Sequence, residues 1–528
     1  MDERSIVLTG FMGTGKSAVG RAVAGALGRP FVDMDAVLEE RLGTTIARYF
    51  AAAGEEAFRR AEAELVSELA GRRGLVIATG GGALVPEESR RLMLQSATVI
   101  LLTCGLAQLQ ERLAGSTHRP LLGEDPGEAI RRLLERRRAA YDAIPLRLDT
   151  SHLSIEEAAE HALRLAQAAP SAPCQVLALP ARAGGYGVAI GEGLLARAGA
   201  LLRAAGVGEQ AVVISEPRVR TLHGAALAAA LGQAGIRARW LAAPSGEAAK
   251  TNSALQALYE ALFECGADRH TTVIALGGGA LSDAAGFAAA TWMRGLPWVT
   301  VPTTLLAQVD AGLGGKVAID HPRGKNLIGA FHPPRLVLVD PALLGTLPAE
   351  ELRAGLAEVV KHGLIADPAL FAHLEAHGPQ PLEQVVAQAV RVKVDVVAED
   401  PEEHGRRAVL NLGHTVGHAL ERTTGFSWRH GDAVSVGMVV ATRLAVRLGI
   451  CEPDLLCRLV ALLERLGLPA QAPPLPPEAL WEAMAADKKR RGGVPSFVLP
   501  VRLGEVVIRS GVDKEDFCAA WKEAIENA

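Results

Sequence analysis

The chain contains 528 residues, too many for one ordinary hydrophobic core, so about two to four domains are expected. Hydrophobic residues make up 49% and aromatic residues only 4%, which favours helix-rich α/β domains over an all-β sandwich. The net charge of −4 excludes a general attraction to nucleic acid, and six cysteines without a CxxC pair favour a reducing compartment. The first residues do not resemble a signal peptide, and no apolar run reaches about eighteen residues. We therefore expect a cytoplasmic protein whose partners are small molecules rather than nucleic acid or membrane.

The first 165 residues alternate short apolar runs with amphipathic stretches. This alternation predicts a parallel sheet with helices on both faces. The predicted elements are strands at 5–9, 74–78 and 98–103 and helices at 16–27, 54–70 and 126–140.

A proline-rich stretch, LAQAAPSAPCQVLALP, predicts a linker at residues 166–180. A second α/β pattern follows, with strands at 211–215 and 271–276. From about residue 341 helical periodicity dominates to the end, apart from a short apolar patch at 496–499. The predicted domains are 1–165, a Rossmann-like α/β nucleotide domain at 181–340, and a mostly helical domain at 341–528.

Residues 10–17, GFMGTGKS, fit the phosphate-binding pattern GxxxxGK(S/T) between a strand and a helix. In such a P-loop, backbone N–H groups and the helix N-terminus attract phosphate. The lysine reaches the β- and γ-phosphates, and the serine hydroxyl binds Mg²⁺. The pattern predicts a site for ATP and Mg²⁺ at Gly13, Thr14, Gly15, Lys16 and Ser17.

The segments that follow the P-loop narrow the class of kinase. They are DMD at 33–35, FRRAE at 58–62, a glycine triplet at 80–82 and HRPLL at 118–122. With these segments, residues 4–165 resemble shikimate kinases. The resemblance implies that Asp35 accepts the proton of the attacking hydroxyl or orients that hydroxyl, and that Asp33 helps to hold Mg²⁺. It implies shikimate contacts at Asp35, Arg59, Gly80, Gly81, Gly82 and Arg137, and further ATP contacts at Arg112 and Arg119. The catalytic residues of this half would be Asp35, Lys16 and Arg119.

The second half contains a glycine turn, Gly277, Gly278 and Gly279, between a strand and a helix, which alone is a weak dinucleotide signal. A stronger signal is a set of residues typical of a metal-binding site. Glu358 is joined by three histidines downstream, and one Glu with two His forms a catalytic zinc set with open positions. Two of the histidines are four residues apart and share a helix face. The histidines are His414, His418 and His430.

Many cationic and amide side chains accompany these residues, which suits a small anionic substrate with phosphate and carboxylate groups. They include Arg294, Lys316, Lys325, Asn326, Lys361, Lys393, Arg407, Asn411 and Lys488. With them, residues 176–528 resemble 3-dehydroquinate synthase. The family reaction converts 3-deoxy-D-arabino-heptulosonate 7-phosphate to 3-dehydroquinate and phosphate, with NAD⁺ regenerated in each turnover.

The resemblance also implies roles for single residues. Glu358, His414 and His430 would bind Zn²⁺ or Co²⁺, and the catalytic residues would be His418, Lys361 and Asp310. Arg294 would reach the substrate phosphate of a neighbouring protomer, so we expect a homodimer through the synthase half. The NAD⁺ contacts would be Glu247, Lys250, Gly277, Gly278, Gly279, Asp283, Thr303, Thr304, Asp310, Lys316, Lys325, Thr346, Leu347 and Glu351. The substrate contacts would be Arg294, Lys316, Asn326, Lys361, Lys393, Arg407, Asn411, His418 and Lys488.

Two positions depart from the family pattern. Ser215 and Glu216 stand where Thr-Asp is common, which weakens any role for Glu216 at the NAD⁺ ribose. Asp320 stands where Asn is usual. The alternatives are another small-molecule P-loop kinase, such as a gluconate kinase, an iron- or zinc-dependent alcohol dehydrogenase, and a half that has become a regulatory module. The cation cluster and the full set of site residues argue against them.

Overall fold

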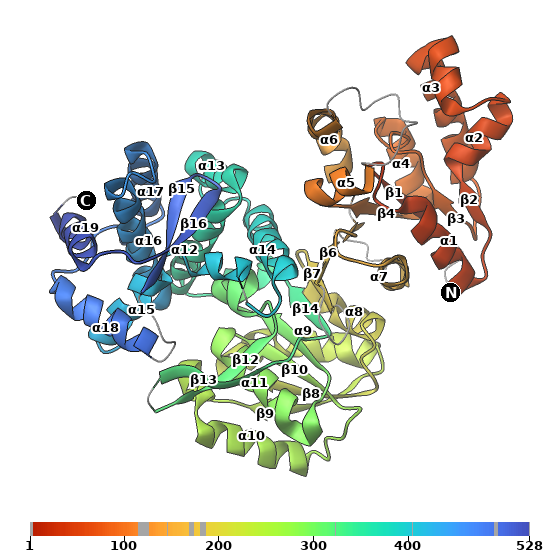
Figure 1. The fold of residues 1–528 in the computed structure, drawn as a ribbon. Coiled ribbons are helices and arrows are strands. Elements are labelled where there is room, and N and C mark those ends of the chain that lie inside the picture. The colour runs from red at the N-terminus through yellow and green to blue at the C-terminus, as the bar shows by residue number, and fades with distance from the viewer. Residues whose placement is uncertain are drawn as a thin grey trace. The chain divides into compact units, whose positions relative to one another are not determined.

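A computed structural model describes residues 4–113, 126–144, 146–167, 174–179, 186–322, 324–403, 405–489 and 495–526. The chain divides into two compact units (Figure 1). The first contains Met1–Gln210 and Ala226–Arg237, and the second contains Ala211–Ala225 and Ala238–Ala528. Among the described residues, no helix is long and apolar enough to cross a membrane.

The first unit is built on a parallel sheet with the order β2-β3-β1-β4-β5. One face is covered by an apolar core that includes Val7, Phe58, Ile77 and Leu101, and α1 and α7 pack against each other at the sheet. The prediction of helices on both faces is therefore confirmed. The strands are β1 (Ser5–Gly10), β2 (Phe31–Asp33), β3 (Val76–Ala78), β4 (Ala97–Thr103) and β5 (Leu146–Asp149). The helices are α1 (Lys16–Leu27), α2 (Met34–Leu42), α3 (Ile46–Ala70), α4 (Glu87–Ser96), α5 (Leu106–Leu113), α6 (Pro126–Asp142) and α7 (Ile155–Gln167).

Helix α3 is longer than predicted. It begins at Ile46 rather than at residue 54, with Thr45 as its N-cap. The predicted start coincides with a break inside the helix, because Gly54 has φ 80° and ψ 169°. A glycine adopts this conformation without the cost that a side chain would add, so the sequence signal marked a kink rather than a helix start.

Part of the predicted linker forms a strand. β6 (Cys174–Leu179) pairs in parallel with β5 and antiparallel with β7 (Tyr186–Ile190). The segment CQVLAL lies between Pro173 and Pro180, so the prolines flank the strand and do not interrupt its hydrogen bonds. The prediction of a linker across all of 166–180 is therefore wrong for residues 174–179. The described part of this unit continues with η1 (Leu194–Arg197) and α8 (Ala198–Ala204).

The second unit has a sheet with the order β14-β11-β10-β8-β9, in which β8, β10, β11 and β14 are parallel. An antiparallel hairpin, β12–β13, packs on α11. The strands are β8 (Gln210–Ser215), β9 (Arg237–Ala242), β10 (Thr272–Gly277), β11 (Trp298–Pro302), β12 (Lys316–His321), β13 (Gly324–Phe331) and β14 (Leu336–Val339). The intervening helices are α9 (Pro217–Gln233), whose residues from Ala226 on belong to the first unit, η2 (Gly246–Lys250), α10 (Asn252–Glu264), α11 (Gly279–Thr291), η3 (Trp292–Arg294), η4 (Ala307–Ala311) and η5 (Pro341–Thr346).

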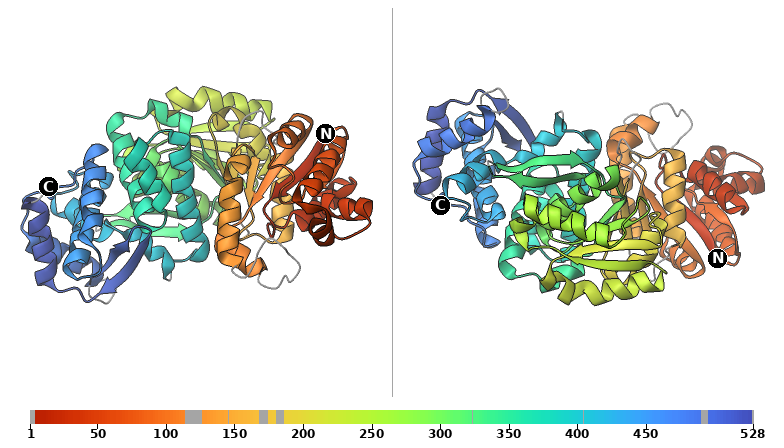
Figure 2. Two further views of the ribbon diagram at one scale, coloured as in Figure 1. Left: turned by 90° about the horizontal axis from the view of Figure 1, so that it is seen from above. Right: turned by 90° about the horizontal axis from the view of Figure 1, so that it is seen from below.

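From residue 349 the described chain is mostly helical, as predicted. An antiparallel hairpin, β15 (Ser496–Arg502) with β16 (Glu505–Ser510), lies beside α16 (Figure 2). The sequence predicted only the apolar patch at its start and missed β16, most of whose residues are exposed. The helices are α12 (Ala349–Ile365), α13 (Pro368–His377), α14 (Leu382–Glu399), η6 (Arg406–Asn411), α15 (His414–Thr423), α16 (His430–Arg447), α17 (Pro453–Arg465), α18 (Pro477–Lys489) and α19 (Lys514–Glu526).

Candidate active sites

The predicted P-loop joins β1 to α1, and its backbone requires glycine. Gly13 and Gly15 have φ 82° and 90°, in the left-handed region. A Cβ on Gly10 would lie 2.2 Å from the carbonyl oxygen of Leu102, so no side chain fits there. The ammonium of Lys16, the first residue of α1, donates a hydrogen bond of 2.9 Å to the carbonyl oxygen of Phe11. The loop therefore places a lysine and a helix N-terminus where a nucleotide phosphate binds.

Arg112 ties α5 to the residues after β5 and to the P-loop. Its guanidinium donates to the carbonyl oxygen of Thr150 at 2.7 Å and to that of Gly13 at 3.4 Å. The hydroxyl of Thr150 donates to the carbonyl oxygen of Thr14 at 3.1 Å. Thr150 was not predicted, although the carboxyl end of a parallel strand is a general ligand-binding position.

Four polar side chains meet at the glycine triplet. A Cβ on Gly80 would lie 2.7 Å from carboxylate oxygens of both Asp35 and Glu62. A Cβ on Gly81 would lie 3.4 Å from Arg137, and one on Gly82 would lie 2.4 Å from Arg59. The structure thus brings together the residues that were predicted to contact shikimate, and it adds Glu62 to them. The absence of side chains on the triplet leaves these polar groups facing one backbone segment.

Two further residues hold the predicted arginines in place. Arg59 donates a 2.5 Å hydrogen bond to Glu62, whose side chain is 3% exposed. Burial raises the pKa of Glu62, while Arg59 lowers it in part. Arg137 and the hydroxyl of Tyr141 both donate to the carbonyl oxygen of Gly81, at 2.7 and 2.9 Å. Glu62 and Tyr141 lie three and four residues after the arginines that they accompany, a spacing that brings helical side chains together.

The remaining kinase predictions are only partly placed. Asp33 ends β2 and caps α2 by accepting the N–H of Asp35 at 3.2 Å. Ser17 follows Lys16 in the first turn of α1. Arg119 lies outside the described residues.

In the second unit, the glycine turn between β10 and α11 packs on the end of β11. The N–H of Thr303 donates to the carbonyl oxygen of Gly277 at 2.9 Å, and a Cβ on Gly278 would lie 3.3 Å from Thr304. A Cβ on Gly279 would lie 2.9 Å from Ala311. The glycine turn, the Thr303–Thr304 segment and the segment of Asp310 and Ala311 are therefore neighbours, and each contains predicted NAD⁺ residues.

A second group of predicted NAD⁺ residues surrounds Lys250, whose ammonium donates to Asp283 at 2.8 Å and also to Asn326. Burial raises the pKa of Asp283 to about 6, although Lys250 opposes the rise. Lys325 pairs with Glu247 at 3.2 Å.

Three other predicted NAD⁺ residues lie at the end of η5, directly after it, and at the start of α12. Thr346 shares a 2.9 Å hydrogen bond with His223, and Leu347 donates its N–H to Leu344. Glu351 pairs with Arg429 at 3.3 Å. The side chains of Thr346 and Glu351 thus contact residues that the sequence did not single out, while the contact of Leu347 is made by its backbone.

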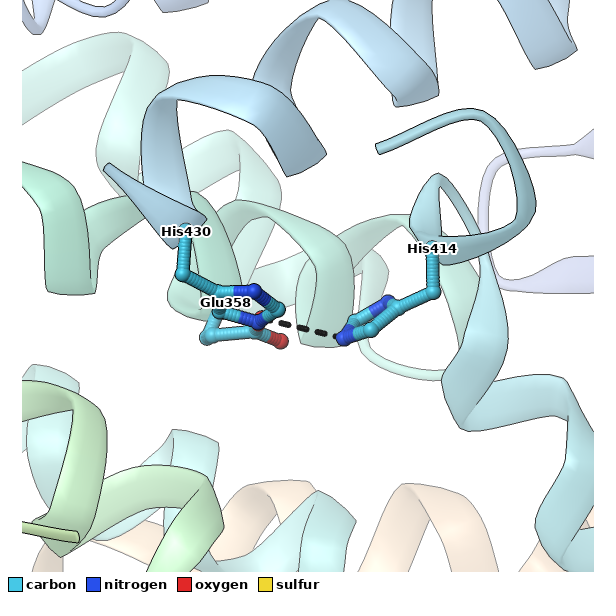
Figure 3. Close-up of side chains that lie close together, drawn as sticks. All are labelled: Glu358, His414 and His430. Atoms are coloured by element: carbon cyan, nitrogen blue, oxygen red, sulfur yellow. Dashed lines mark ion pairs between the residues drawn. The ribbon is translucent and has the colours of Figure 1, made fainter. Parts of the chain in front are cut away.

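The predicted metal residues converge from three helices (Figure 3). Glu358 is fully buried in α12, while His414 and His430 are the first residues of α15 and α16. One ligand atom from each lies within 4.8 Å of the others, and each histidine Nε2 is 3.5 Å from Glu358 Oε1. The helices approach closely at glycines, since a Cβ on Gly431 would lie 1.9 Å from the carbonyl oxygen of Ala354.

The chemistry of this group fits a divalent cation. Neither carboxylate oxygen of Glu358 has a hydrogen-bond partner among the described residues, apart from its ion pairs. Burial lowers the pKa of His414 well below its usual range and so favours the neutral ring that binds metal. Burial lowers the pKa of His430, but Glu358 and Glu421 outweigh it and raise the value to about 9. A buried carboxylate between two imidazoles matches a zinc set with open positions.

A neighbouring group shares one of these residues. His418, Glu421 and His430 also bring one possible ligand atom each within 4.8 Å. His418 is exposed, unlike His414, and its ring lies 5.3 Å from that of His414. Glu421 is buried and was not predicted, although it follows His418 by three residues on the same helix.

Beside Glu358 the structure places a chain of opposite charges. Lys393 donates to Asp310 at 2.5 Å, and Lys361 pairs with Glu358. Burial raises the pKa of Asp310, but Lys361 and Lys393 outweigh it and hold the value well below the usual range. These predicted catalytic and substrate residues therefore lie next to the metal group.

The other predicted substrate residues are placed as follows. Arg407 is buried and donates to the carbonyl oxygen of Pro401 at 2.7 Å, and Lys316 pairs with Glu403. Asn411 ends η6. Arg294 is exposed at the end of η3 with φ 69°. The side chain of Lys488 lies outside the described part of the chain.

The two units thus have the features of two enzyme classes: a P-loop kinase, and a metal-dependent enzyme on a nucleotide-binding α/β fold. Family models match both. Residues 12–167 match shikimate kinase, and residues 240–354 and 355–490 match the N-terminal and C-terminal parts of 3-dehydroquinate synthase. The chain belongs to the 3-dehydroquinate synthase family and carries a shikimate kinase domain ahead of the synthase.

Individual relatives agree with this assignment. The chain is 48% identical over 340 residues to the 3-dehydroquinate synthase of Symbiobacterium thermophilum, covering 62% of this chain and 95% of that protein. It is 45% identical over 352 residues to the synthase of a Synechococcus species, covering 64% and 95%. Among solved structures, 2-epi-5-epi-valiolone synthase from Streptomyces hygroscopicus, with NAD⁺ and Zn²⁺ bound, is similar at a TM-score of 0.61 and 31% identity, covering 65% of this chain and 97% of that one. The prediction of a two-enzyme fusion is confirmed, and an alcohol dehydrogenase is not favoured.

Proposed function

We propose that the kinase half transfers the γ-phosphoryl group of ATP to shikimate. We propose that the synthase half converts 3-deoxy-D-arabino-heptulosonate 7-phosphate to 3-dehydroquinate and phosphate with NAD⁺ and a divalent metal. The observation that carries the synthase proposal is the buried Glu358 between two histidines, beside the Asp310, Lys361 and Lys393 group. The kinase proposal rests on the polar groups that meet at the glycine triplet.

In the kinase half, Lys16 neutralises charge on the β- and γ-phosphates, and Ser17 and Asp33 hold Mg²⁺. Asp35 lies beside Gly80 and orients the shikimate hydroxyl or accepts its proton. Arg112 contacts the nucleotide, and Arg119 stabilises charge on the transferring group.

The shikimate carboxylate is bound by Arg59 and Arg137, because planar guanidinium groups match a carboxylate with two hydrogen bonds. Glu62 is a positioning residue that fixes the direction of Arg59. Gly80, Gly81 and Gly82 leave room for the shikimate hydroxyls at the backbone.

In the synthase half, Glu358, His414 and His430 hold Zn²⁺ or Co²⁺, the ions named in two related solved structures. When bound, the ion acts as a Lewis acid toward substrate hydroxyls and so favours hydride transfer to NAD⁺. His418 moves a proton near the substrate phosphate, and Lys361 and Asp310 orient the reacting groups. The glycine turn with Thr303 and Thr304 binds the NAD⁺ phosphates, while Asp283 and Lys250 bind further along the cofactor.

The anionic substrate is held by cations at its two ends. Its phosphate is bound by Lys316, Asn326, Arg407 and Lys488, and its carboxylate and hydroxyls are bound by Lys361, Lys393 and Asn411. Arg294 is exposed and reaches the phosphate of a second protomer, which makes the protein a homodimer through the synthase half. The enzyme is cytoplasmic, with functional domains at 1–165, 181–340 and 341–528.

Metal removal tests the synthase proposal within the intact chain. Dialysis against a chelator is expected to abolish NAD⁺-dependent phosphate release. The bound ion supplies a positive charge that acts on the substrate hydroxyls, and Glu358, His414 and His430 cannot supply that charge themselves. Readdition of Zn²⁺ or Co²⁺ should restore it. ADP release with shikimate, measured in the same sample with Mg²⁺ supplied, serves as the internal control. Phosphate release that persists in metal-free protein would contradict the proposal.

Separate fragments test the domain proposal. Fragments 1–173 and 174–528 are each expected to keep their own activity. Because β6 pairs with β5, the cut at residue 173 exposes an edge of the kinase sheet. We therefore expect fragment 1–173 to melt several degrees below fragment 1–192, since each lost hydrogen bond costs roughly 1 kcal/mol. A fragment that is soluble but inactive, while the whole chain works, would overturn the independence of the halves.

A further inference from the structure

Lys250 is buried where three elements of the second unit meet: η2, α11 and the β12–β13 hairpin. Its side chain is 4% exposed, and its ammonium donates to Asp283 at 2.8 Å and to the side-chain oxygen of Asn326. Asp320 Oδ1 lies 3.9 Å from the same ammonium. A desolvated ammonium is costly unless negative groups surround it, so these partners determine where Lys250 can lie.

Asp320 stands at an irregularity in the hairpin. The register of β12 against β13 shifts between Ile319 and His321, with Asp320 between them. Such a bulge turns a side chain away from the regular alternation of a strand. Here Asp320 Oδ1 accepts the backbone N–H of Asn326 across the turn at 2.7 Å.

Asn326 has φ 56°, in the left-handed region, a backbone conformation that residues other than glycine adopt at a cost in free energy. The hydrogen bond from its N–H to Asp320 stabilises this conformation. The conformation in turn directs the side chain of Asn326 to Lys250. One carboxylate oxygen thus contacts the backbone of a proposed substrate residue and faces a proposed NAD⁺ residue.

We propose that Asp320 is a positioning residue that links the NAD⁺ site to the substrate phosphate site, by holding Asn326 through its N–H and balancing the charge of Lys250. This inference rests on the roles proposed above for Asn326 and Lys250. The carboxylate has two separable properties: either Asp or Asn at position 320 can accept the N–H, but only Asp supplies a negative charge.

The charge of Asp320 also acts on Asp283. The charged groups around Asp283 are Lys250 and Glu247 from η2 and Asp320 from β12, and Glu247 is itself paired with Lys325 from β13. Burial raises the pKa of Asp283 to about 6, Lys250 lowers it, and Glu247 and Asp320 raise it. If the ionised Asp283 binds NAD⁺, the affinity for NAD⁺ falls as the pH drops through this pKa. Removing the charge of Asp320 lowers the pKa of Asp283 and moves that fall to lower pH.

The variants Asp320→Asn and Asp320→Ala separate the two properties in the full-length, metal-loaded chain. We expect Asp320→Asn to keep KM for the heptulosonate phosphate within about twofold, because the acceptor remains. Asp320→Ala should raise KM about five- to tenfold with a smaller change in kcat, as loss of one positioning hydrogen bond predicts. Both variants should shift the pH midpoint of NAD⁺ binding downward. Glu260→Gln, on the exposed face of α10, is the matched control.

The inference is overturned if Asp320→Ala leaves both KM and the NAD⁺ midpoint at their wild-type values. It is also overturned if Asp320→Asn raises KM as much as Asp320→Ala does while the pH midpoint of NAD⁺ binding stays fixed. Neither the hydrogen-bond acceptor at position 320 nor its negative charge would then act as proposed. Thermal midpoints of all variants identify a general loss of folding, and Asp320→Asn keeps the test valid if the alanine variant is unstable. Failure of the proposed function would look different, because the wild-type chain itself would then release no phosphate.

Discussion

Replacing Lys16 by alanine is expected to lower phosphorylation of shikimate on the order of 10³-fold or more, and to leave phosphate release by the synthase half unchanged. The lysine begins α1 at the end of the P-loop, where its charge faces the phosphates of a bound nucleotide. It is also the only lysine among the first 249 residues, so no other lysine in the kinase half can replace it. The measurement is ADP release with shikimate, paired with phosphate release from the heptulosonate phosphate.

A surface variant on the same unit provides the control for Lys16→Ala. Arg91→Ala removes a side chain that is 55% exposed on α4, and it should leave both activities unchanged. The single lysine offers a second readout in fragment 1–173. An amine-specific reagent should label Lys16 and the α-amino group alone, and ATP should protect Lys16. Near-normal kinase activity in Lys16→Ala, or labelling that ATP does not reduce, would refute the assignment.

Much of both sites could be predicted because short-range geometry encodes them. The P-loop pattern requires glycine at positions 10 and 15. The structure explains Gly15 by its φ of 90°, and Gly10 by the 2.2 Å that would separate a Cβ there from the carbonyl oxygen of Leu102. Glu62 and Tyr141 could have been added by the same reasoning. They lie one helical turn from Arg59 and Arg137, so the spacing alone brings them beside the predicted arginines.

Other contacts could not be predicted because they join distant segments. Asp310 meets Lys393 across 83 positions of sequence, and Thr150 meets the P-loop across 136. No local pattern specifies which charges neutralise each other after folding. The misplaced linker has a different cause: Pro173 and Pro180 dominate the composition, while the hydrogen bonds that make β6 a strand come from β5 and β7. The two neighbouring strands, rather than the composition of the segment itself, decide its structure.

His414 and His418 share a helix face but are expected to have different functions, and alanine variants separate them. His414→Ala removes a buried nitrogen that lies 3.5 Å from Glu358, so bound metal and synthase activity should both fall sharply. His418→Ala removes an exposed imidazole, so the metal should remain while turnover falls roughly 10²- to 10⁴-fold, the range for a positioned acid or base. The measurement is metal content per chain taken with turnover.

The neighbouring group of His418, Glu421 and His430 makes this comparison decisive, because it offers the ion another place to bind. If His418→Ala loses the metal and His414→Ala keeps it, the ion is bound by that group and the ligand assignment is reversed. If both variants keep it, neither histidine is a ligand. His377→Ala, on the exposed side of α13, is the control and should change neither metal content nor turnover. Apart from its ion pairs, Glu358 has no hydrogen-bond partner for either carboxylate oxygen in the described chain, and burial keeps His414 neutral. We therefore expect the ion at Glu358, His414 and His430.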